Sequence, residues 1–365
     1  MKKKRRTRRN YLGLFIAVFF ITIILVCAVV GGVYMVMQHN ADTAKTDDGK
    51  ETAGEIESYE ADIPAESDET ADTAGESDES EATDEPDETD DDEEAGNTGR
   101  DPDKNYITVE ISEEELQTGS LILANPDHEY TRPDEGKLPT IYEKKTRNYK
   151  VSSSATALDG ECIDAINDMM ADFVEATGRK DVIVRDGYRS YDDQMDIYSA
   201  YVNSYGIAAA EGNVAVGGCS DHNTALGFDL AVYTDDGATE KLSYDTTYNY
   251  LINNCYKYGI VRRYSTPKNS ITKLYEEWHF RYVGVPHAYY MRKCDYCLEE
   301  YLDALREYPC DGEHLTFSDD EGHSWEIFSV PVTNDGKCSF EIADDAEYTV
   351  SGTNCGFAVV TVAIN

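Results

Sequence analysis

The stretch SDHNTALGFD (residues 220–229), followed about fifty residues later by EEWH (276–279), decides how this chain is interpreted. Together the two stretches contain three candidate ligands for a zinc ion: His222, Asp229 and His279. Zinc in a hydrolase usually has three protein ligands and leaves one position for water. Glu276 stands three residues before the second histidine and is a candidate general base for that water. The sequence therefore supplies the parts for metal-assisted hydrolysis.

The spacing of these residues is compatible with one shared cavity. His222 and Asp229 are seven residues apart, and a helix or turn that runs into a strand between them can return both side chains to one metal. Glu276 and His279 are expected on an approach turn into a second strand. Spacing alone leaves a bland alternative open, in which these are satisfied polar groups of an ordinary core. Histidines without such company are expected to be structural or surface residues: His39, His128, His287, His314 and His323.

Two further motifs carry a family resemblance. The stretch DGYRSYDDQ (186–194) precedes SDHNTALGFD, and EEWHFRYVG (276–284) follows it. In this order the three motifs resemble the VanY-type D,D-carboxypeptidases, a family of zinc peptidases that act on the stem peptides of bacterial cell walls. The likeness spans about residues 105–305.

The resemblance implies a role for each matching position. Zinc would be bound by His222, Asp229 and His279. Glu276 would activate the zinc-bound water and then protonate the leaving amine. Arg189 would polarise the scissile carbonyl and stabilise the oxyanion, a task that suits its fixed fork of donors. The residues expected to contact the peptide are Ser220 and Gln194.

The chain departs from the family pattern beside the expected ligands. Ala225 stands where the family usually has glycine, and Gly227 stands where it usually has alanine. If that glycine has a positive φ, alanine would cost about 1 kcal/mol or impose another turn. Glu277 replaces a common proline. None of these changes removes an expected ligand, the base or the arginine, but they affect the shape of the pocket.

The N-terminus predicts export with retention in the membrane. Residues 2–9 carry seven positive charges, and 11–37 are uncharged. That run of 27 residues exceeds the ~20 that cross a hydrocarbon core. The basic block marks the cytoplasmic side, so the remainder is expected outside the cell. A cleaved signal peptide is the alternative, although such peptides usually have shorter apolar regions of about 7–15 residues.

An acidic, low-complexity segment follows the expected span. Residues 41–100 contain 25 acidic and 3 basic residues, a net charge of −22. Such a segment buries too little apolar surface to fold, and it is expected to be a solvated spacer or a solubilising tail. The whole chain has a formal net charge of −40. That balance argues against nucleic acid as a partner.

Eight cysteines lie beyond the expected span, an even number that permits disulfides in an exported region. Their connectivity does not follow from the sequence, since eight cysteines allow 105 pairings. Cys338 and Cys355 flank short strand-like runs and are the expected local pair. The CDYC stretch (294–297) lies in a helical-looking segment and is expected to be structural.

Hydrophobic patterning predicts an α+β fold, with a central antiparallel sheet flanked by helices in the zinc peptidase domain. Helices are expected at 162–177, 192–205, 248–258 and 286–308. Strands are expected at 106–111, 182–184, 228–233 and 279–283. Later runs at 325–330, 338–342, 348–350 and 358–364 indicate a small antiparallel β module. The predicted organisation is a cytoplasmic basic segment (1–10), a transmembrane signal anchor (11–37), a disordered acidic linker (38–104), a catalytic domain (105–309) and the β module (310–365).

The expected function is a membrane-anchored zinc carboxypeptidase that removes the C-terminal D-alanine from peptidoglycan stem peptides. An L,D-carboxypeptidase or an endopeptidase on the same scaffold is an alternative, because loops outside the motifs set the cleavage position. A non-catalytic wall-binding module is another, but it would have no need of Glu276. The sequence leaves the oligomeric state open. It also leaves open whether the β module binds wall polymer, docks a partner or, as we favour, braces the catalytic domain.

Overall fold

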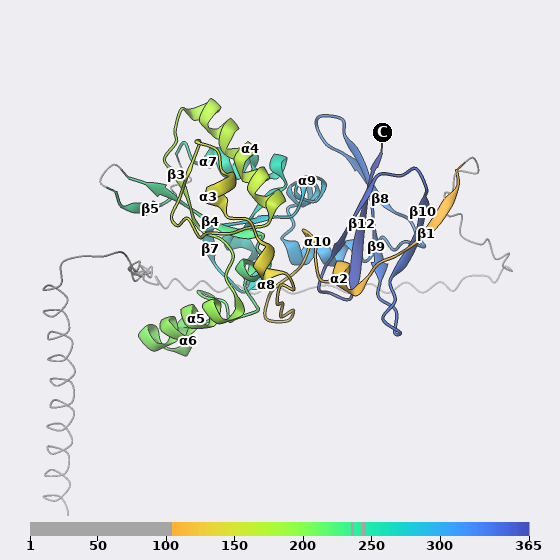
Figure 1. Ribbon diagram of the computed structural model, residues 1–365, viewed down its shortest axis with the longest axis horizontal. Coiled ribbons are helices and arrows are strands. Elements are labelled where there is room, and N and C mark those ends of the chain that lie inside the picture. Colours follow the sequence, from red (N-terminus) through yellow and green to blue (C-terminus); the bar gives the residue numbers. More distant parts are fainter. Residues whose placement is uncertain (1–103, 235–236, 243–245, 365) are drawn as a thin grey trace, which may run out of the picture. The chain divides into compact units, whose positions relative to one another are not determined.

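The computed structural model describes residues 104–234, 237–242 and 246–364. Its largest sheet has the strand order β2–β3–β4–β7–β6, and β5 pairs with β4 (Figure 1). The strands are β2 (Lys150–Val151), β3 (Val182–Asp186), β4 (Gly227–Tyr233), β5 (Thr239–Lys241), β6 (Ile260–Tyr264) and β7 (Glu276–Tyr282). The expected antiparallel pairing holds throughout this sheet except between β2 and β3, which are parallel.

This sheet separates an apolar layer from a polar one, because successive side chains in a strand point to opposite faces. Phe228 and Leu230 of β4 and Phe280 of β7 belong to the hydrophobic core. The residues that alternate with them include Asp229 and His279. The polar face of β4 and β7 therefore holds the candidate ligands while the other face packs against helices.

Helices cover the apolar face. They are α3 (Ile141–Lys144), α4 (Gly160–Thr177) and α7 (Asn249–Asn254), whose side chains share one core cluster with the sheet. The helix α4 begins where the Asp159 side chain accepts a hydrogen bond from the N–H of Glu161, and it ends at Gly178 with φ 73°. The predicted helix at 162–177 is thereby confirmed over its whole length, and α4 begins two residues earlier.

Further helices precede or connect the strands of the large sheet. They are α5 (Tyr191–Tyr205), α6 (Ile207–Ala210), α8 (Asn269–Thr272) and the 3₁₀ helices η1 (Glu135–Lys137), η2 (Asp221–Thr224), η3 (Cys255–Tyr258) and η4 (Thr266–Lys268). The predicted helix at 248–258 is therefore α7 continued by η3. The prediction at 192–205 matches α5.

The C-terminal strands form a second sheet with the order β11–β12–β9–β8, in which every pair is antiparallel. Its strands are β8 (Leu315–Ser318), β9 (Ser324–Pro331), β11 (Tyr348–Gly352) and β12 (Phe357–Ile364). Val359 of β12 packs toward α9 (Val285–Cys294) and α10 (Leu298–Leu305), whereas Val360 packs in a separate core on the opposite face. Burial of both faces explains the continuous apolar run in β12.

The first strand, which the prediction included in the catalytic domain (105–309), pairs outside the large sheet. β1 (Tyr106–Glu110) pairs with β10 (Ser339–Ala343), not with the large sheet. The short α2 (Glu113–Leu116) contacts β11. The C-terminal β module is therefore defined here as β1, α2 and β8–β12. Alternating hydrophobicity predicted the strand, but its partner lies more than 200 residues away, and local patterning carries no signal for such a choice.

The single helix predicted at 286–308 is divided into α9 and α10. Asp295 has a left-handed backbone with φ 54° and ends α9. A new helix begins after Cys297, whose N–H donates to Glu300 Oε2 at 2.8 Å. The CDYC stretch is thus the junction between two helices.

All eight cysteines of the described residues are free, so the expected Cys338–Cys355 pair is wrong. Cys338 is buried and directs its thiol to the carbonyl of Val330. The expected span at 11–37 and the acidic linker lie outside the described residues. Among the residues that are described, no helix is both long and apolar enough to cross a bilayer.

Candidate metal centre

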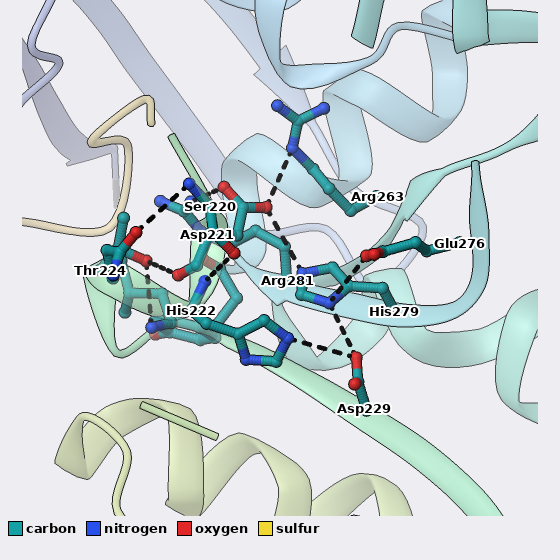
Figure 2. Close-up of polar contacts among 12 residues, drawn as sticks. Ser220, Asp221, His222, Thr224, Asp229, Arg263, Glu276, His279 and Arg281 are labelled. Atoms are coloured by element: carbon teal, nitrogen blue, oxygen red, sulfur yellow. Dashed lines mark hydrogen bonds and ion pairs between the residues drawn. The ribbon is translucent and has the colours of Figure 1, made fainter. Parts of the chain in front are cut away.

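The two strands that carry the candidate ligands are direct neighbours. Asp229 of β4 stands opposite His279 of β7, so a separation of fifty residues in sequence becomes one cross-strand pair. His279 Nδ1 lies 2.9 Å from Asp229 Oδ1, and His222 Nε2 lies 3.4 Å from the same oxygen (Figure 2). One ligand atom from each of the three residues lies within 4.8 Å of the others, and all three residues are buried. The predicted trio is brought together.

His222 lies on η2 and is oriented by the Ser220 hydroxyl and by the backbone carbonyl of Gly187. The Ser220 hydroxyl accepts a hydrogen bond from the His222 N–H and begins this helix. His222 Nδ1 lies 2.6 Å from the carbonyl of Gly187, which accepts its proton. The tautomer with a proton on Nδ1 leaves Nε2 as the ligand atom facing Asp229.

Charges within the cluster hold it in a form suited to a cation. Burial alone would raise the pKa of the Asp229 carboxyl, but His222 and His279 hold that pKa well below its usual value. Burial would lower the pKa of His279, but the carboxylates of Asp221 and Asp229 beside its ring raise the pKa to about 9. A metal ion on Nδ1 would take the place of a proton on that nitrogen.

Glu276 lies beside the cluster because β7 is irregular. Between the pairs Arg262–Phe280 and Tyr264–Glu276, β6 advances two residues while β7 advances four. In a regular strand, side chains three residues apart point to opposite faces. Here Glu276 Oε2 lies 3.8 Å from His279 Nδ1 (Figure 2). The expected approach turn is thus an irregular first part of β7 itself.

The pKa of Glu276 is raised, chiefly by burial, while the neighbouring positive groups oppose the shift. A carboxylate that has a raised pKa and lies beside metal ligands is suited to accept and return a proton.

Arg189 reaches the cluster from the turn after β3. Its Nη2 lies 3.8 Å from Asp229 Oδ2, and its Nε donates to Asp186 Oδ2 at 2.9 Å. Nη1 donates to Gln194 Oε1 at 2.9 Å. The guanidinium is therefore held beside the metal ligands by one charged and one neutral partner.

Ser220 and Gln194 both have partners within the protein. Ser220 caps η2, and Gln194 binds Arg189 through its oxygen and the carbonyl of Ala215 through its amide nitrogen. Both side chains position catalytic candidates in this geometry. Direct contact of either residue with a peptide stays a prediction.

The two departures beside Asp229 have a physical explanation. Ala225 adopts the left-handed conformation, with φ 63° and ψ 16°, which is the strained position that the glycine pattern implies. At Gly227 an added Cβ would lie 2.9 Å from His279 Nε2 and 2.8 Å from Asp221 Cβ. Glycine at 227 therefore admits the close packing of Asp221 against His279.

Sequence reasoning missed the buried charges behind His279. Asp221 contacts Arg263 and Arg281, and Arg263 also pairs with Glu299 of α10. Asp221 and Arg281 lie inside the motifs at 220–229 and 276–284, so their places in these motifs could have marked them as residues of the site. Arg263 and Glu299 carry no motif, and only the tertiary structure brings them to the site.

The comparisons with known proteins agree with this geometry. A family model described as "VanY: D-alanyl-D-alanine carboxypeptidase" matches residues 155–285. A D-alanyl-D-alanine carboxypeptidase of Enterococcus faecium is 29% identical over 257 residues, which cover 69% of this chain and 78% of the relative. The bifunctional D-Ala-D-Ala dipeptidase and carboxypeptidase VanXYC of Enterococcus gallinarum is 34% identical over 139 residues, covering 37% of this chain and 73% of the relative.

A solved structure shows the same similarity in three dimensions. It is the vancomycin resistance D,D-dipeptidase VanXYg in complex with a D-Ala-D-Ala phosphinate analogue. The alignment has a TM-score of 0.63 and 26% sequence identity, and it covers 71% of this chain and 100% of that one.

Proposed function

This chain belongs to the VanY family of D-alanyl-D-alanine carboxypeptidases, and on that basis we propose that it removes the C-terminal D-alanine from peptidoglycan stem peptides. It is a metallopeptidase of the zinc-dependent D-alanyl-D-alanine carboxypeptidase type. The observation that carries the proposed reaction is the buried cluster of His222, Asp229 and His279 with Glu276 in contact.

The donor set fits zinc. It offers two imidazole nitrogens and one carboxylate, the ligand types and number that catalytic zinc sites use. His222 would bind through Nε2 and His279 through Nδ1, because these nitrogens face Asp229. When bound, zinc lowers the pKa of a water molecule and polarises the scissile carbonyl.

Glu276 is the proposed general base. Its carboxylate takes a proton from the attacking water and gives that proton to the nitrogen of the departing D-alanine, which breaks the peptide bond. Its position beside His279 Nδ1 and its raised pKa support both transfers.

Arg189 is the proposed stabiliser of the oxyanion. A guanidinium has five N–H donors. Three of them are used by the hydrogen bonds to Asp186 and Gln194 within the described structure. The side chain is held in a fixed position by these bonds while its other N–H groups are available to the carbonyl oxygen of the substrate. Such preorganised donors are worth about 10²–10³ in rate.

The proposed cleavage is exo and follows the fourth residue of a pentapeptide stem. Purified chain should be incubated with synthetic muropentapeptide, murotetrapeptide and D-Ala-D-Ala, with and without a chelator, and the products weighed by mass spectrometry. We expect loss of one alanine from the pentapeptide, abolished by the chelator and restored by zinc. Shortening of the tetrapeptide would indicate an L,D-carboxypeptidase, and cleavage of the free dipeptide alone would indicate a dipeptidase.

Metal analysis of two histidine variants tests the ligand assignment. His222→Ala should lose bound zinc because it removes one of three ligands, whereas His128→Ala, outside the cluster, should retain it. Full zinc occupancy in His222→Ala would remove this residue from the ligand set.

The proposed location is the outer face of the cell membrane, with residues 11–37 as a single span. The seven positive charges at 2–9 and the 27 uncharged residues that follow support this topology. Protease added to intact cells should digest the chain beyond the span. A protected catalytic domain would reverse the topology.

A further inference from the structure

Two buried polar atoms face each other behind the cluster of candidate metal ligands. His279 Nε2 and Asp221 Oδ2 lie 3.7 Å apart, and both side chains are fully buried. Within the described residues, His279 Nε2 has no hydrogen-bond partner, and Asp221 Oδ2 has its ion pair with Arg263 Nε at 3.0 Å but no hydrogen bond of normal geometry. Because His279 Nδ1 faces Asp229, a metal ion there requires the remaining ring proton to be on Nε2. A small approach of the two side chains would turn the contact into a hydrogen bond that satisfies both atoms.

Asp221 is fixed by two arginines. Arg281 Nη1 lies 2.7 Å from Asp221 Oδ1, and Arg263 Nε lies 3.0 Å from Asp221 Oδ2 (Figure 2). Arg263 also makes a two-pronged ion pair with Glu299, at 2.8 and 2.6 Å. The four charges balance, and the two arginines are at most 2% exposed. Paired charges of this kind hold a buried carboxylate in one position.

Arg281 continues the network away from the cluster. Its Nη2 donates to the carbonyl oxygens of Ser120 and Ile122, at 3.0 and 2.7 Å. These residues belong to the bridging segment, defined here as residues 120–123, which follows α2. The same guanidinium therefore contacts both the carboxylate behind His279 and the backbone of the bridging segment.

The C-terminal β module holds the bridging segment from its other side. Leu121 N–H donates to Ser351 Oγ at 2.9 Å, and Leu123 N–H donates to the carbonyl of Thr353 at 2.9 Å. The Asn354 side chain donates to the carbonyl of Leu123 at 3.0 Å. The packing is close, since a Cβ added at Gly119 would lie 2.4 Å from Ser351 Oγ.

We propose that Asp221 is a positioning residue for His279, and that Arg281 and the bridging segment couple it to the C-terminal β module, so that the module helps to set the affinity for the metal. The inference rests on the metal site of the proposed function but not on the peptide bond that is cleaved. Carboxylates that orient a ligating histidine typically contribute 10–100-fold in metal affinity or activity.

The test measures metal binding by the full chain, without substrate. Zinc affinity is determined by competition with a chromophoric chelator, and the visible spectrum of the cobalt-substituted protein reports ligand geometry. Asp221→Asn should bind zinc about 10–100-fold more weakly and give an altered cobalt spectrum. Asp221→Glu, which restores an anionic acceptor, should recover part of the affinity. Asp181→Asn is the matched control. Asp181 directly precedes β3 and forms an ion pair with Arg179, so this change weakens an ion pair outside the cluster and should leave zinc affinity and the cobalt spectrum unchanged.

The module is tested by a pair of buried serines. Ser351→Ala removes the acceptor for Leu121, whereas Ser329→Ala removes a hydroxyl that binds the carbonyl of Tyr308 in the same module. We expect zinc affinity to fall about threefold or more in Ser351→Ala and to stay unchanged in Ser329→Ala. If Asp221→Asn does not fold, this pair still decides the coupling.

The outcomes separate this proposal from the proposed function. Wild-type zinc affinity and cobalt spectrum in a folded Asp221→Asn would overturn the positioning role. Equal affinities in the two serine variants would overturn the coupling to the module. A wild-type chain that binds zinc but leaves every stem peptide intact would overturn the proposed function alone.

Discussion

The large sheet and the C-terminal β module use their strands differently. β4 and β7 have one apolar face and one face with buried charged and polar residues, among them Asp229, His279 and Arg281. β12 instead has no charged residue, and Phe357–Val362 is buried on both faces, because helices cover one and β1 and β10 cover the other. Buried charge is costly unless it is paired, so a face that carries it is evidence of a site. Among the described residues, the buried polar side chains of the module are neutral (Ser329, Ser351, Thr353 and Thr361), and its contribution to chemistry is therefore expected to be indirect.

The largest expected effect is at Glu276 of β7, the proposed general base. Glu276→Gln should lower kcat by about 10²–10⁴-fold while zinc remains bound, because an amide preserves size but cannot take a proton. Steady-state kinetics on a pentapeptide, with metal content measured on the same sample, tests this. Glu277→Gln, one residue away, is the matched control and should stay near wild type. Near wild-type turnover in Glu276→Gln would assign the base to another residue.

The junction between the two regions should be sensitive to acid. Burial lowers the pKa of His287 to about 3, and its ring contacts Tyr301 of α10 and Thr361 of β12. An unfolded histidine titrates near 6.5, so between about pH 6.5 and 3 the unfolded state binds a proton that the folded state does not. Stability is therefore lost as the pH falls through this window, by about 2–3 kcal/mol at pH 4.5.

A variant isolates this histidine from the carboxylates that also titrate. Urea unfolding at pH 7.5 and pH 4.5 should show a smaller loss of stability for His287→Gln than for wild type, since glutamine does not titrate. Equal losses in the two proteins would mean that His287 is protonated in the folded state or is not buried.

A core change in the module should affect stability without affecting chemistry. Val360→Ala removes two methyl groups from a fully buried position on the face of β12 that lies away from α9 and α10. We expect the free energy of unfolding to fall by roughly 2 kcal/mol, with kcat unchanged when zinc is saturating. A large fall in kcat would show that the module acts on the reaction directly and not only through stability.

The smallest effect is expected at Ala225. Relief of its left-handed conformation by Ala225→Gly should gain about 1 kcal/mol, but the change also removes one buried methyl, worth about 0.8 kcal/mol. The two terms nearly cancel, so the free energy of unfolding, measured by thermal unfolding, should change by less than about 0.5 kcal/mol. A gain well above 1 kcal/mol would show that the turn stores more strain than its φ value implies.

Residues near the motifs could be predicted from the sequence, because local chemistry is written there. The zinc ligand types, the glutamate and the arginine are all present in short stretches, and strand pairing then brought Asp229 and His279 face to face. The approach of Glu276 required a strand irregularity that no spacing rule contains. The partners of Asp221 were unpredictable for another reason. Arg263 and Glu299 lie on elements whose packing is decided by the whole core.

The pairing of β1 with β10 makes the large sheet an insertion within the C-terminal β module. During synthesis every strand of that sheet is complete before β10 emerges, and domains generally fold as units in the order in which they appear. β1 must then wait with an open edge while more than 200 residues fold between it and its partner. The strands β8–β12 follow every strand of the large sheet in the chain, and β8, β9 and β12 among them pack against α9 and α10. A chain shortened before residue 339 would leave β1 without its partner β10.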